Sequence, residues 1–256
     1  MTDLVRTTVA NGVYQIEMNR PDKKNALTAE MYSAMADGLV EAEANPAVRV
    51  ILIYGSQGNF TAGNDLSDFL RNPPADKNSP VFRFINGFAN LQKPFVAAVE
   101  GIAVGVGTTM LLHCDLVYAG SGARFCLPFA NLGLTPEAGS SLLLAQRIGH
   151  VRAAEMLMLG EQFNAEFALY SGLVNAVIPD GQVVEHALSR CEKLAMQPAA
   201  SIRITKDLMV RNQRPLVREI MARESLIFGQ QLGSPEAKEA FSAFLEKRRP
   251  DFSKIT

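Results

Sequence analysis

The sequence predicts an α/β core followed by a helical C-terminal extension, and two observations carry this prediction. The first is that short apolar runs of strand length alternate with segments of helical periodicity. These runs are VRVILIY (48–54), FVAAVEG (95–101) and DLVYAG (115–120). The second is that only helical patterns remain from Gly181 to the end. Strands that are apolar throughout are typical of a parallel sheet buried on both faces, with helices packed against it.

The N-terminal elements have clear local signals. Asn11-Gly12 lies between two runs of β-forming residues, which is the strongest short signal for a hairpin. Thr28 is expected to cap the helix that follows, and this helix should end near Asn45-Pro46.

The next elements continue the alternation. Helical segments are expected at 80–91 and 105–113, between the apolar strands. The stretch 71–80 is rich in Pro, Asn and charged residues, which predicts a mobile loop. Further along, Asn164 should cap a short helix, and VNAVIP (174–179) is the last predicted strand.

Composition and charge exclude several classes of function. Apolar residues make up 48% of the 256 residues and the net charge is −1, so the chain can bury a substantial core and has no electrostatic attraction to nucleic acid or an anionic membrane. No run of 18 apolar residues and no signal peptide is visible. Cys114, Cys126 and Cys191 lack CxxC spacing, which predicts reduced thiols and a cytoplasmic protein.

Most motifs for cofactor or nucleophile chemistry are missing. The sequence contains no GxxxxGK[ST] and no GxSxG motif, and GVGTTM (105–110) has Met110 where a dinucleotide turn needs its third glycine. The three histidines are scattered without metal-ligand spacing. We therefore expect no metal site and no separate cofactor.

Two glycine-rich turns follow predicted strands. FTAGNDL (60–66) comes after the strand at 48–54, and GIAVGVGTTM (101–110) comes after the strand at 95–101. Small residues at such turns leave backbone N–H groups exposed, and two amides that converge on one carbonyl oxygen would form an oxyanion hole. The alternative for each turn alone is that its glycines only permit tight turns and close packing.

Glu137 is the only charged residue in FANLGLTPEAGSS (129–141). The local pattern favours a helix start, with Thr135 as N-cap, Pro136 as the first helical residue and the acid near the positive end of the helix dipole. The alternative is that Glu137 also transfers protons, as a base near the two glycine-rich turns.

Over essentially its whole length the chain resembles the crotonase, or enoyl-CoA hydratase/isomerase, superfamily. Six segments carry the resemblance: NRPDKKNALT (19–28), FTAGNDL (60–66), KPFVAAVEGIAVGVGTTMLLHCDLVYAG (93–120), PFANLGLTPEAGSS (128–141), TKDLM (205–209) and AFSAFLEKRRPDF (240–252). The resemblance implies a crotonase-type spiral of ββα units in residues 1–197 and a helical trimerisation region in residues 198–256. It also implies an acyl-CoA thioester substrate, with coenzyme A entering as part of that substrate.

The resemblance assigns roles to individual residues. The oxyanion-hole amides are those of Asn64 and Val106, although the family usually has glycine at the second position. The residues expected to line the CoA and acyl site are Lys24, Ala26, Ala62, Asp65, Leu66, Phe129, Phe244 and Lys247. For Lys247, a solvated helix charge is the alternative to a phosphate contact.

The sequence departs from the hydratases of this family at both catalytic glutamates, whose positions are taken by Thr109 and Phe129. Neither side chain transfers protons as a carboxylate does, so hydration by the two-glutamate scheme is not expected. The position of Glu137 instead resembles that of the single glutamate in peroxisomal-type Δ3,Δ2-enoyl-CoA isomerases. One carboxylate that acts as base and then as acid needs a raised pKa, which the apolar side chains near Glu137 would supply.

The resemblance therefore predicts an isomerase that moves the double bond of a 3-enoyl-CoA to position 2. Two alternatives stay open at this point. One is another reaction of the superfamily, either hydration or the isomerisation of a ring epoxide, for which related enzymes carry an aspartate at this position. The other is a non-catalytic acyl-CoA binding protein with the same fold. The apolar residues of the C-terminal helices also predict a homotrimer or homohexamer.

Overall fold

The computed structural model describes residues 3–74 and 78–255. Its strands are β1 Val5–Ala10, β2 Val13–Met18, β3 Val50–Gly55, β4 Phe95–Val99, β5 Ile102–Val104, β6 Leu116–Gly120, β7 Arg124–Cys126, β8 Phe163–Asn164 and β9 Ala176–Ile178. Its α-helices are α1 Ala29–Ala44, α2 Leu66–Arg71, α3 Pro80–Phe88, α4 Val106–Thr109, α5 Ser140–Ile148, α6 His150–Leu159, α7 Ala165–Tyr170, α8 Val183–Ala195, α9 Ala199–Val210, α10 Arg214–Leu232 and α11 Pro235–Leu245. Short 3₁₀ helices are η1 Pro21–Lys23, η2 Met110–His113, η3 Ala130–Leu132 and η4 Phe252–Lys254.

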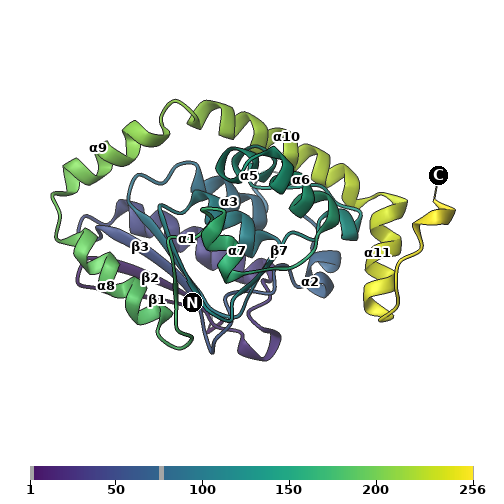
Figure 1. The fold of residues 1–256 in the computed structure, drawn as a ribbon, viewed down its shortest axis with the longest axis horizontal. Helices are drawn as coiled ribbons and strands as arrows, with labels where there is room; N and C mark the ends of the chain where they lie inside the picture. Colours follow the sequence, from purple (N-terminus) through teal and green to yellow (C-terminus); the bar gives the residue numbers. More distant parts are fainter. Residues whose placement is uncertain (1–2, 75–77, 256) are drawn as a thin grey trace.

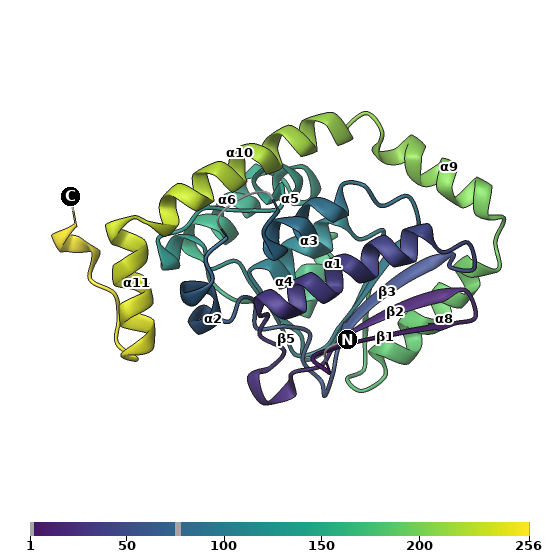
Figure 2. The ribbon, with the colours of Figure 1, turned by 180° about the vertical axis from the view of Figure 1, so that it is seen from behind.

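A six-stranded sheet forms the centre of the core, in the order β1-β2-β3-β4-β6-β9. Only the β1–β2 hairpin is antiparallel, and the other four pairings are parallel. One face of the sheet packs against α8, and the other face packs against α1 and α3 (Figures 1 and 2). The apolar strands predicted from the sequence are thus covered on both faces, and the α/β prediction is confirmed.

Three local signals predicted from the sequence, one hairpin turn and two helix caps, are confirmed. Asn11 and Gly12 form the hairpin turn with φ values of 50° and 77°, as a turn of this kind requires. Thr28 caps α1, because its hydroxyl accepts a hydrogen bond from the backbone N–H of Met31 at 3.3 Å. Asn164 caps α7 in the same way, through a 2.9 Å bond from the N–H of Phe167.

A second sheet of three short strands, β5-β7-β8, was not predicted. Its strands have three, three and two residues, which is too short for hydrophobic periodicity to indicate them. Part of the loop predicted at 71–80 also cannot be compared, because residues 75–77 lie outside the described residues. No helix within the described residues combines the length and apolar character needed to cross a membrane.

The C-terminal helices α9 and α10 arch over one side of the core, and α11 folds down at the end of the arch (Figure 1). A buried lysine ties α9 to the sheet. The Lys206 ammonium donates to the Asp115 carboxylate at 2.7 Å and to the backbone carbonyl of Lys93 at 2.8 Å. The same carboxylate oxygen accepts a bond from the N–H of Phe95, the first residue of β4.

We expect Lys206→Met to lower the free energy of unfolding by about 3–5 kcal/mol, because it leaves the mostly buried Asp115 carboxylate without its cation. The matched control is Lys193→Met, which removes an exposed lysine from α8 and should change stability by about 0.5 kcal/mol or less. Chemical denaturation of both variants measures the difference. Equal losses in the two variants would show that the pair does not anchor α9.

Candidate active site

The two glycine-rich turns lie side by side at the carboxyl ends of β3 and β4. Thr61 pairs with the second turn through two backbone bonds, from its N–H to the carbonyl of Ile102 (2.9 Å) and from the N–H of Val104 to its carbonyl (3.1 Å). A Cβ atom on Gly63 would lie 2.7 Å from the carbonyl oxygen of Val104, so this position needs glycine. The turns therefore do more than reverse the chain, because they pack directly against each other.

The amides of Asn64 and Val106 donate no hydrogen bond to any of the residues in 3–74 and 78–255. The backbone N–H of Leu27 donates to the carbonyl of Gly63 at 2.8 Å, and the carbonyl of Leu27 accepts from the N–H of Asp65 at 2.9 Å. Because these bonds use the groups on one side of the segment, the N–H of Asn64 lies on its other side. Val106 is the first residue of α4 and follows Gly105, whose φ of 56° favours glycine. Both amides are thus free to donate hydrogen bonds to an oxyanion.

Glu137 is buried, with 7% of its surface exposed. The hydroxyl of Thr109, at the end of α4, donates to its Oε1 atom at 2.5 Å. Burial raises the pKa of Glu137 to about 7, the Thr109 hydrogen bond lowers it, and the Glu224 carboxylate raises it further. The direction of this shift is the one predicted from the sequence. A carboxyl group with such a pKa can both accept and donate a proton near neutral pH.

The interpretation of Glu137 as part of a helix start is wrong. Helix α5 begins three residues later, at Ser140, and its N-cap is Gly139. Ala138 and Gly139 have φ values of 58° and 73°, and the N–H of Ser140 bonds to the carbonyl of Glu137 at 3.0 Å, so the chain makes a tight turn where a helix was expected. The hydroxyl of Thr135 is buried and has no hydrogen-bond partner within the described residues, so it caps nothing there.

Tyr32 is a member of this cluster that the sequence did not indicate. Its hydroxyl donates a short hydrogen bond to the side-chain oxygen of Asn64. Burial, and then the nearby charge of Glu137, raises the pKa of Tyr32 well above 10, so the phenol stays protonated. In the sequence, a tyrosine on the apolar face of α1 cannot be distinguished from a core residue.

His113 holds the chain immediately after Glu137. Its Nε2 atom lies 2.6 Å from the backbone carbonyl oxygen of Ala138. Burial lowers the pKa of His113 to about 4, so the ring is neutral at physiological pH, and Nε2 carries the proton that it donates to this carbonyl. The bond supports the turn at Ala138, whose positive φ is unfavourable for a residue with a side chain.

Five of the residues predicted for the CoA site lie close together on two segments. The N–H of Ala62 bonds to the carbonyl of Lys24 at 3.0 Å. One guanidinium nitrogen of Arg20 bonds to both the carbonyl of Ala26 (2.9 Å) and the carboxylate of Asp65 (2.7 Å). Asp65 also caps α2, which begins at Leu66, while the side chain of Lys24 is exposed.

The pKa of Asp65 follows from these contacts. Its burial alone would raise the pKa, but hydrogen bonds from the N–H of Asp68 and from Arg20 outweigh burial and leave the pKa below its usual range. Asp65 therefore stays ionised and holds α2 and Arg20 in place. Arg20 is a second residue that sequence reasoning missed. It lies in the NRPDKKNALT motif, but the motif does not show that this arginine pairs with Asp65, 45 positions further along the chain.

The remaining three predicted residues lie on different segments. Phe129 is 5% exposed and belongs to the main hydrophobic cluster, with Val106 and Leu134. Phe244, on α11, is 60% exposed, and Lys247 is exposed just beyond the end of that helix. Helix α11 packs against η3, the turn that follows Phe129, and against α10. The contact with η3 is made by the first turn of α11, where Ala237 lies against Gly133, so Phe244 and Lys247 lie at the other end of this helix, away from that contact. The Lys24 group lies beside the end of β3, where the side chain of Asn25 donates to the carbonyl of Ser56 at 3.1 Å.

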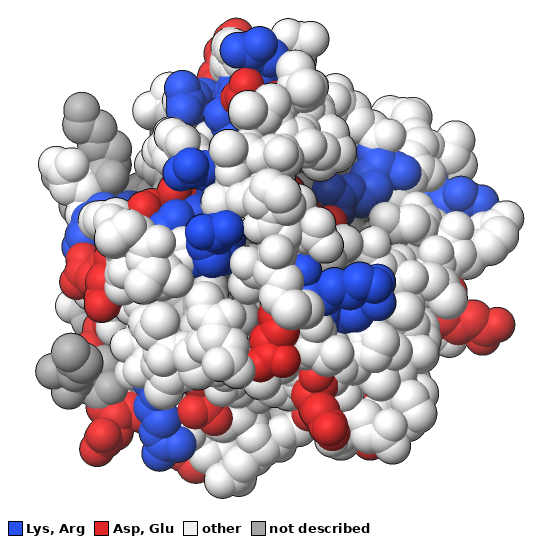
Figure 3. Space-filling model, turned by 90° about the vertical axis from the view of Figure 1, so that its left-hand side faces the viewer, with Lys and Arg blue, Asp and Glu red and all other residues white. Residues whose placement is uncertain are grey.

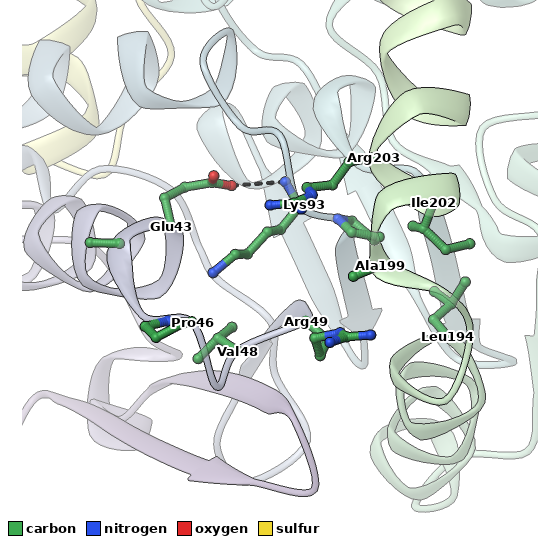
Figure 4. Close-up of a pocket in the computed structure, with 11 residues that line it drawn as sticks. Glu43, Pro46, Val48, Arg49, Lys93, Leu194, Ala199, Ile202 and Arg203 are labelled. Carbon is green, nitrogen blue, oxygen red and sulfur yellow. Dashed lines mark hydrogen bonds between the residues drawn. The ribbon is translucent and has the colours of Figure 1, made fainter.

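A pocket of about 330 Å³ lies at the opposite end of the sheet, where β3 and β4 begin (Figure 4). Three basic side chains line it, those of Arg49, Lys93 and Arg203, together with the carboxylate of Glu43. The ammonium of Lys93 is satisfied by the carbonyls of Ala42 and Asn45, at 2.6 and 2.7 Å. Among the described residues that line this pocket, none is predicted for the acyl-CoA site.

The surface charges around the molecule's α8–α9 side are mixed in sign. Figure 3 shows Lys and Arg side chains mainly across the upper half of this face, with Asp and Glu side chains mainly below them. Within the described residues, no group of three or more His, Cys, Asp or Glu side chains is placed to hold a metal ion. All three cysteines are buried and unpaired.

Comparison with known proteins places these features in a family. The family profile described as "Enoyl-CoA hydratase/isomerase" matches residues 8–254. Enoyl-CoA delta isomerase 2 of Rattus norvegicus is 33% identical over 250 residues, which cover 95% of this chain and 64% of that longer protein. The 1,2-epoxyphenylacetyl-CoA isomerase of Escherichia coli is 32% identical over 269 residues, which cover 99% of each chain.

Solved structures show the same fold. The structure of OdaA from Pseudomonas aeruginosa aligns with a TM-score of 0.93 and 48% identity, covering 95% of this chain and 99% of that one. The predicted fold class, an α/β spiral with a helical C-terminal region, is therefore confirmed.

Proposed function

Because this chain belongs to the enoyl-CoA hydratase/isomerase family, we propose that it is an acyl-CoA isomerase that moves the double bond of a 3-enoyl thioester to position 2. One observation carries the proposal. Glu137 is the buried carboxylate bonded to Thr109 and has a pKa of about 7, while Thr109 and Phe129 occupy the two positions matched to the hydratase glutamates.

In the proposed mechanism, the Glu137 carboxylate removes a proton from C2 of the thioester. The negative charge that develops on the thioester oxygen is stabilised by the amides of Asn64 and Val106, which donate to no described residue of the chain. The resulting dienolate carries electron density at C4 as well as at C2. The protonated Glu137 then returns the proton at C4, which leaves the double bond between C2 and C3.

The surrounding residues suit this cycle. A pKa near 7 means that neither the carboxylate nor the acid form of Glu137 is strongly favoured at neutral pH. Thr109 fixes one oxygen of the carboxylate, and Tyr32 fixes the side chain of Asn64. Coenzyme A would enter only as the carrier of the acyl group, on the surface formed by Lys24, Ala62 and their neighbours.

A second candidate is the isomerisation of a ring-epoxide thioester. It is favoured by the full-length similarity to the Escherichia coli 1,2-epoxyphenylacetyl-CoA isomerase, which covers 99% of both chains. A single carboxylate and an oxyanion hole would suit that reaction as well. The two reactions differ in the acyl group of the substrate, whereas the same residues would hold the thioester in both.

Product analysis separates these reactions. The protein is incubated with a 3-enoyl-CoA, with a 2-enoyl-CoA and with 1,2-epoxyphenylacetyl-CoA, and each product is identified by mass and retention time. Conversion of the 3-enoyl-CoA to the 2-enoyl-CoA at the highest kcat/KM supports the proposal. Fastest turnover of the epoxide would favour the second candidate. Binding of all three without turnover would identify an acyl-CoA binding protein.

We also propose that the protein assembles as a homotrimer or homohexamer. Several apolar side chains on the C-terminal helices are largely exposed in the single chain, namely Leu208 (62%), Met209 (63%) and Leu226 (65%). Two other apolar residues of the C-terminal helices, Met221 and Phe228, are already buried within the chain and cannot contribute to an interface. Light scattering at micromolar concentration should give three or six times the chain mass of 27.8 kDa. A monomeric mass would contradict this proposal.

A further inference from the structure

A second buried carboxylate lies beneath the turn that follows Glu137. Glu224, in the middle of α10, is 7% exposed. Its Oε2 atom accepts a hydrogen bond from the N–H of Gly139 at 2.5 Å, and its Oε1 atom accepts from the N–H (3.0 Å) and the hydroxyl (2.5 Å) of Ser141. Burial raises the pKa of Glu224, and because all three partners are donors, their hydrogen bonds favour the ionised form and offset part of that rise.

These bonds replace the helix cap that the sequence had suggested. Gly139 has no side chain with which to cap α5, and Thr135 does not reach the helix start. Glu224 instead binds the amide of the N-cap residue and one amide of the first turn, from a position 85 residues away in the chain. The helix start therefore depends on α10.

Helix α10 can come this close because residue 139 is a glycine. A Cβ atom there would lie 3.3 Å from Cγ of Met221 and 3.5 Å from Cγ1 of Val217, both on α10. The turn itself is strained at Ala138, whose φ is 58°. A turn in this conformation persists only where its surroundings fix it, and the Glu224 carboxylate is one of the groups that do so.

Building on the proposed function, we propose that Glu224 is a positioning residue that fixes the Glu137 turn through Gly139 and Ser141. It is one of three anchors on this segment. Thr109 binds the side chain of Glu137, His113 binds the carbonyl of Ala138, and Glu224 binds the two amides that follow. A helix of the C-terminal region thus takes part in the geometry of the site.

The charge of Glu224 also acts on Glu137. The groups that face Glu137 are the hydroxyls of Thr109 and Tyr32 and the carboxylate of Glu224, while the neutral ring of His113 binds the next residue. The nearest cation on α5, Arg147, is held by the carbonyls of Leu111 and Leu112. Removing the negative charge of Glu224 should therefore lower the pKa of Glu137.

The test compares Glu224→Gln with Glu224→Asp in the full-length protein. A glutamine side chain has one oxygen and one NH₂ group, so it can accept hydrogen bonds at only one of the two positions where Glu224 accepts them. Either the N–H of Gly139 or that of Ser141 therefore loses its partner. We expect Glu224→Gln to lower kcat about 10–100-fold with little change in KM. The acid limb of its kcat–pH profile should move to lower pH by about 0.5–1. Glu224→Asp keeps the negative charge, so the acid limb of its kcat–pH profile should stay close to the wild-type position.

The matched control is Glu219→Gln, which removes an exposed glutamate from the same helix and should leave rate and profile unchanged. Hydrogen exchange of the peptide that covers residues 137–143 gives a readout that does not depend on activity, and Glu224→Gln should accelerate it. If Glu224→Gln keeps the wild-type kcat, acid limb and exchange rate, the proposal is wrong. If the wild type does not isomerise 3-enoyl-CoA at all, the proposed function fails, and the exchange rates alone decide whether Glu224 fixes the turn.

Discussion

Replacing Glu137 by glutamine is expected to slow the isomerisation of a 3-enoyl-CoA by about 10²–10⁴-fold, which corresponds to roughly 3–5 kcal/mol in the activation barrier. The glutamine keeps the shape of the side chain and can still accept the bond from Thr109, but it cannot take a proton from C2. Binding of the thioester should persist, because the amides of Asn64 and Val106 are unchanged.

The same substitution is expected to stabilise the folded protein. Burial raises the pKa of Glu137 from 4.5 to about 7, so the fold disfavours the charged form. This penalty is absent below pH 4.5, grows as the pH rises toward 7, and is complete above it. At pH 8 the shift corresponds to roughly 3 kcal/mol, so Glu137→Gln should raise the melting temperature more at pH 8 than at pH 5. An acid that only stabilised a helix start would give the opposite result, a loss of about 0.3–1 kcal/mol.

The control is Glu161→Gln. Glu161 is exposed and lies in the loop between α6 and β8, so its replacement should leave both the rate and the melting temperature nearly unchanged. Wild-type isomerisation by Glu137→Gln would rule out the proton transfer assigned to this residue.

Hydration of crotonyl-CoA is expected to be orders of magnitude slower than isomerisation of a 3-enoyl-CoA. The two-glutamate scheme orients and deprotonates water with one pair of carboxylates. The family resemblance matches their positions to Thr109 and Phe129, whose side chains are buried and carry no carboxylate. Each missing acid or base costs about 10²–10⁴-fold in rate. The measurement is kcat/KM for both substrates with the same enzyme preparation.

Comparable kcat/KM values would contradict this assignment. They would mean that another group activates water in place of the missing pair, and Glu137 is the first candidate. The variant Glu137→Gln provides the check, because in that case it would abolish both reactions. A hydration rate that survives in Glu137→Gln would point to a group outside the described cluster.

Several parts of the structure could be predicted from the sequence because their signals are local. Asn11-Gly12, Thr28 and Asn164 each act through neighbours within a few residues, so their hairpin and caps could be predicted. The buried strands could be predicted because they are apolar throughout. The three-stranded sheet β5-β7-β8 could not, because its short strands are defined by partners elsewhere in the chain.

In the candidate site, too, some features have local signals in the sequence and others depend on distant residues. The two glycine-rich turns and Glu137 belong to motifs that can be recognised in the sequence. The contacts that complete the cluster join residues 25 to 85 positions apart, as with His113 and Ala138, Tyr32 and Asn64, or Glu224 and Gly139. Thr135-Pro136-Glu137 has every local feature of a helix start, and the packing of α10 on Gly139 overrides it. A rule based on neighbouring residues cannot detect that effect.

The most direct test of the single-carboxylate mechanism follows the proton itself. A 3-enoyl-CoA that carries deuterium at C2 is converted in ordinary water, and the 2-enoyl product is analysed by NMR for deuterium at C4. Because Glu137 is only 7% exposed, the deuteron it accepts should be partly shielded from exchange with water. The account predicts that a measurable fraction of the C2 deuterium appears at C4, and that Glu137→Gln abolishes this transfer. Wild-type product whose C4 carries only hydrogen from the solvent, or transfer that survives in Glu137→Gln, would contradict it.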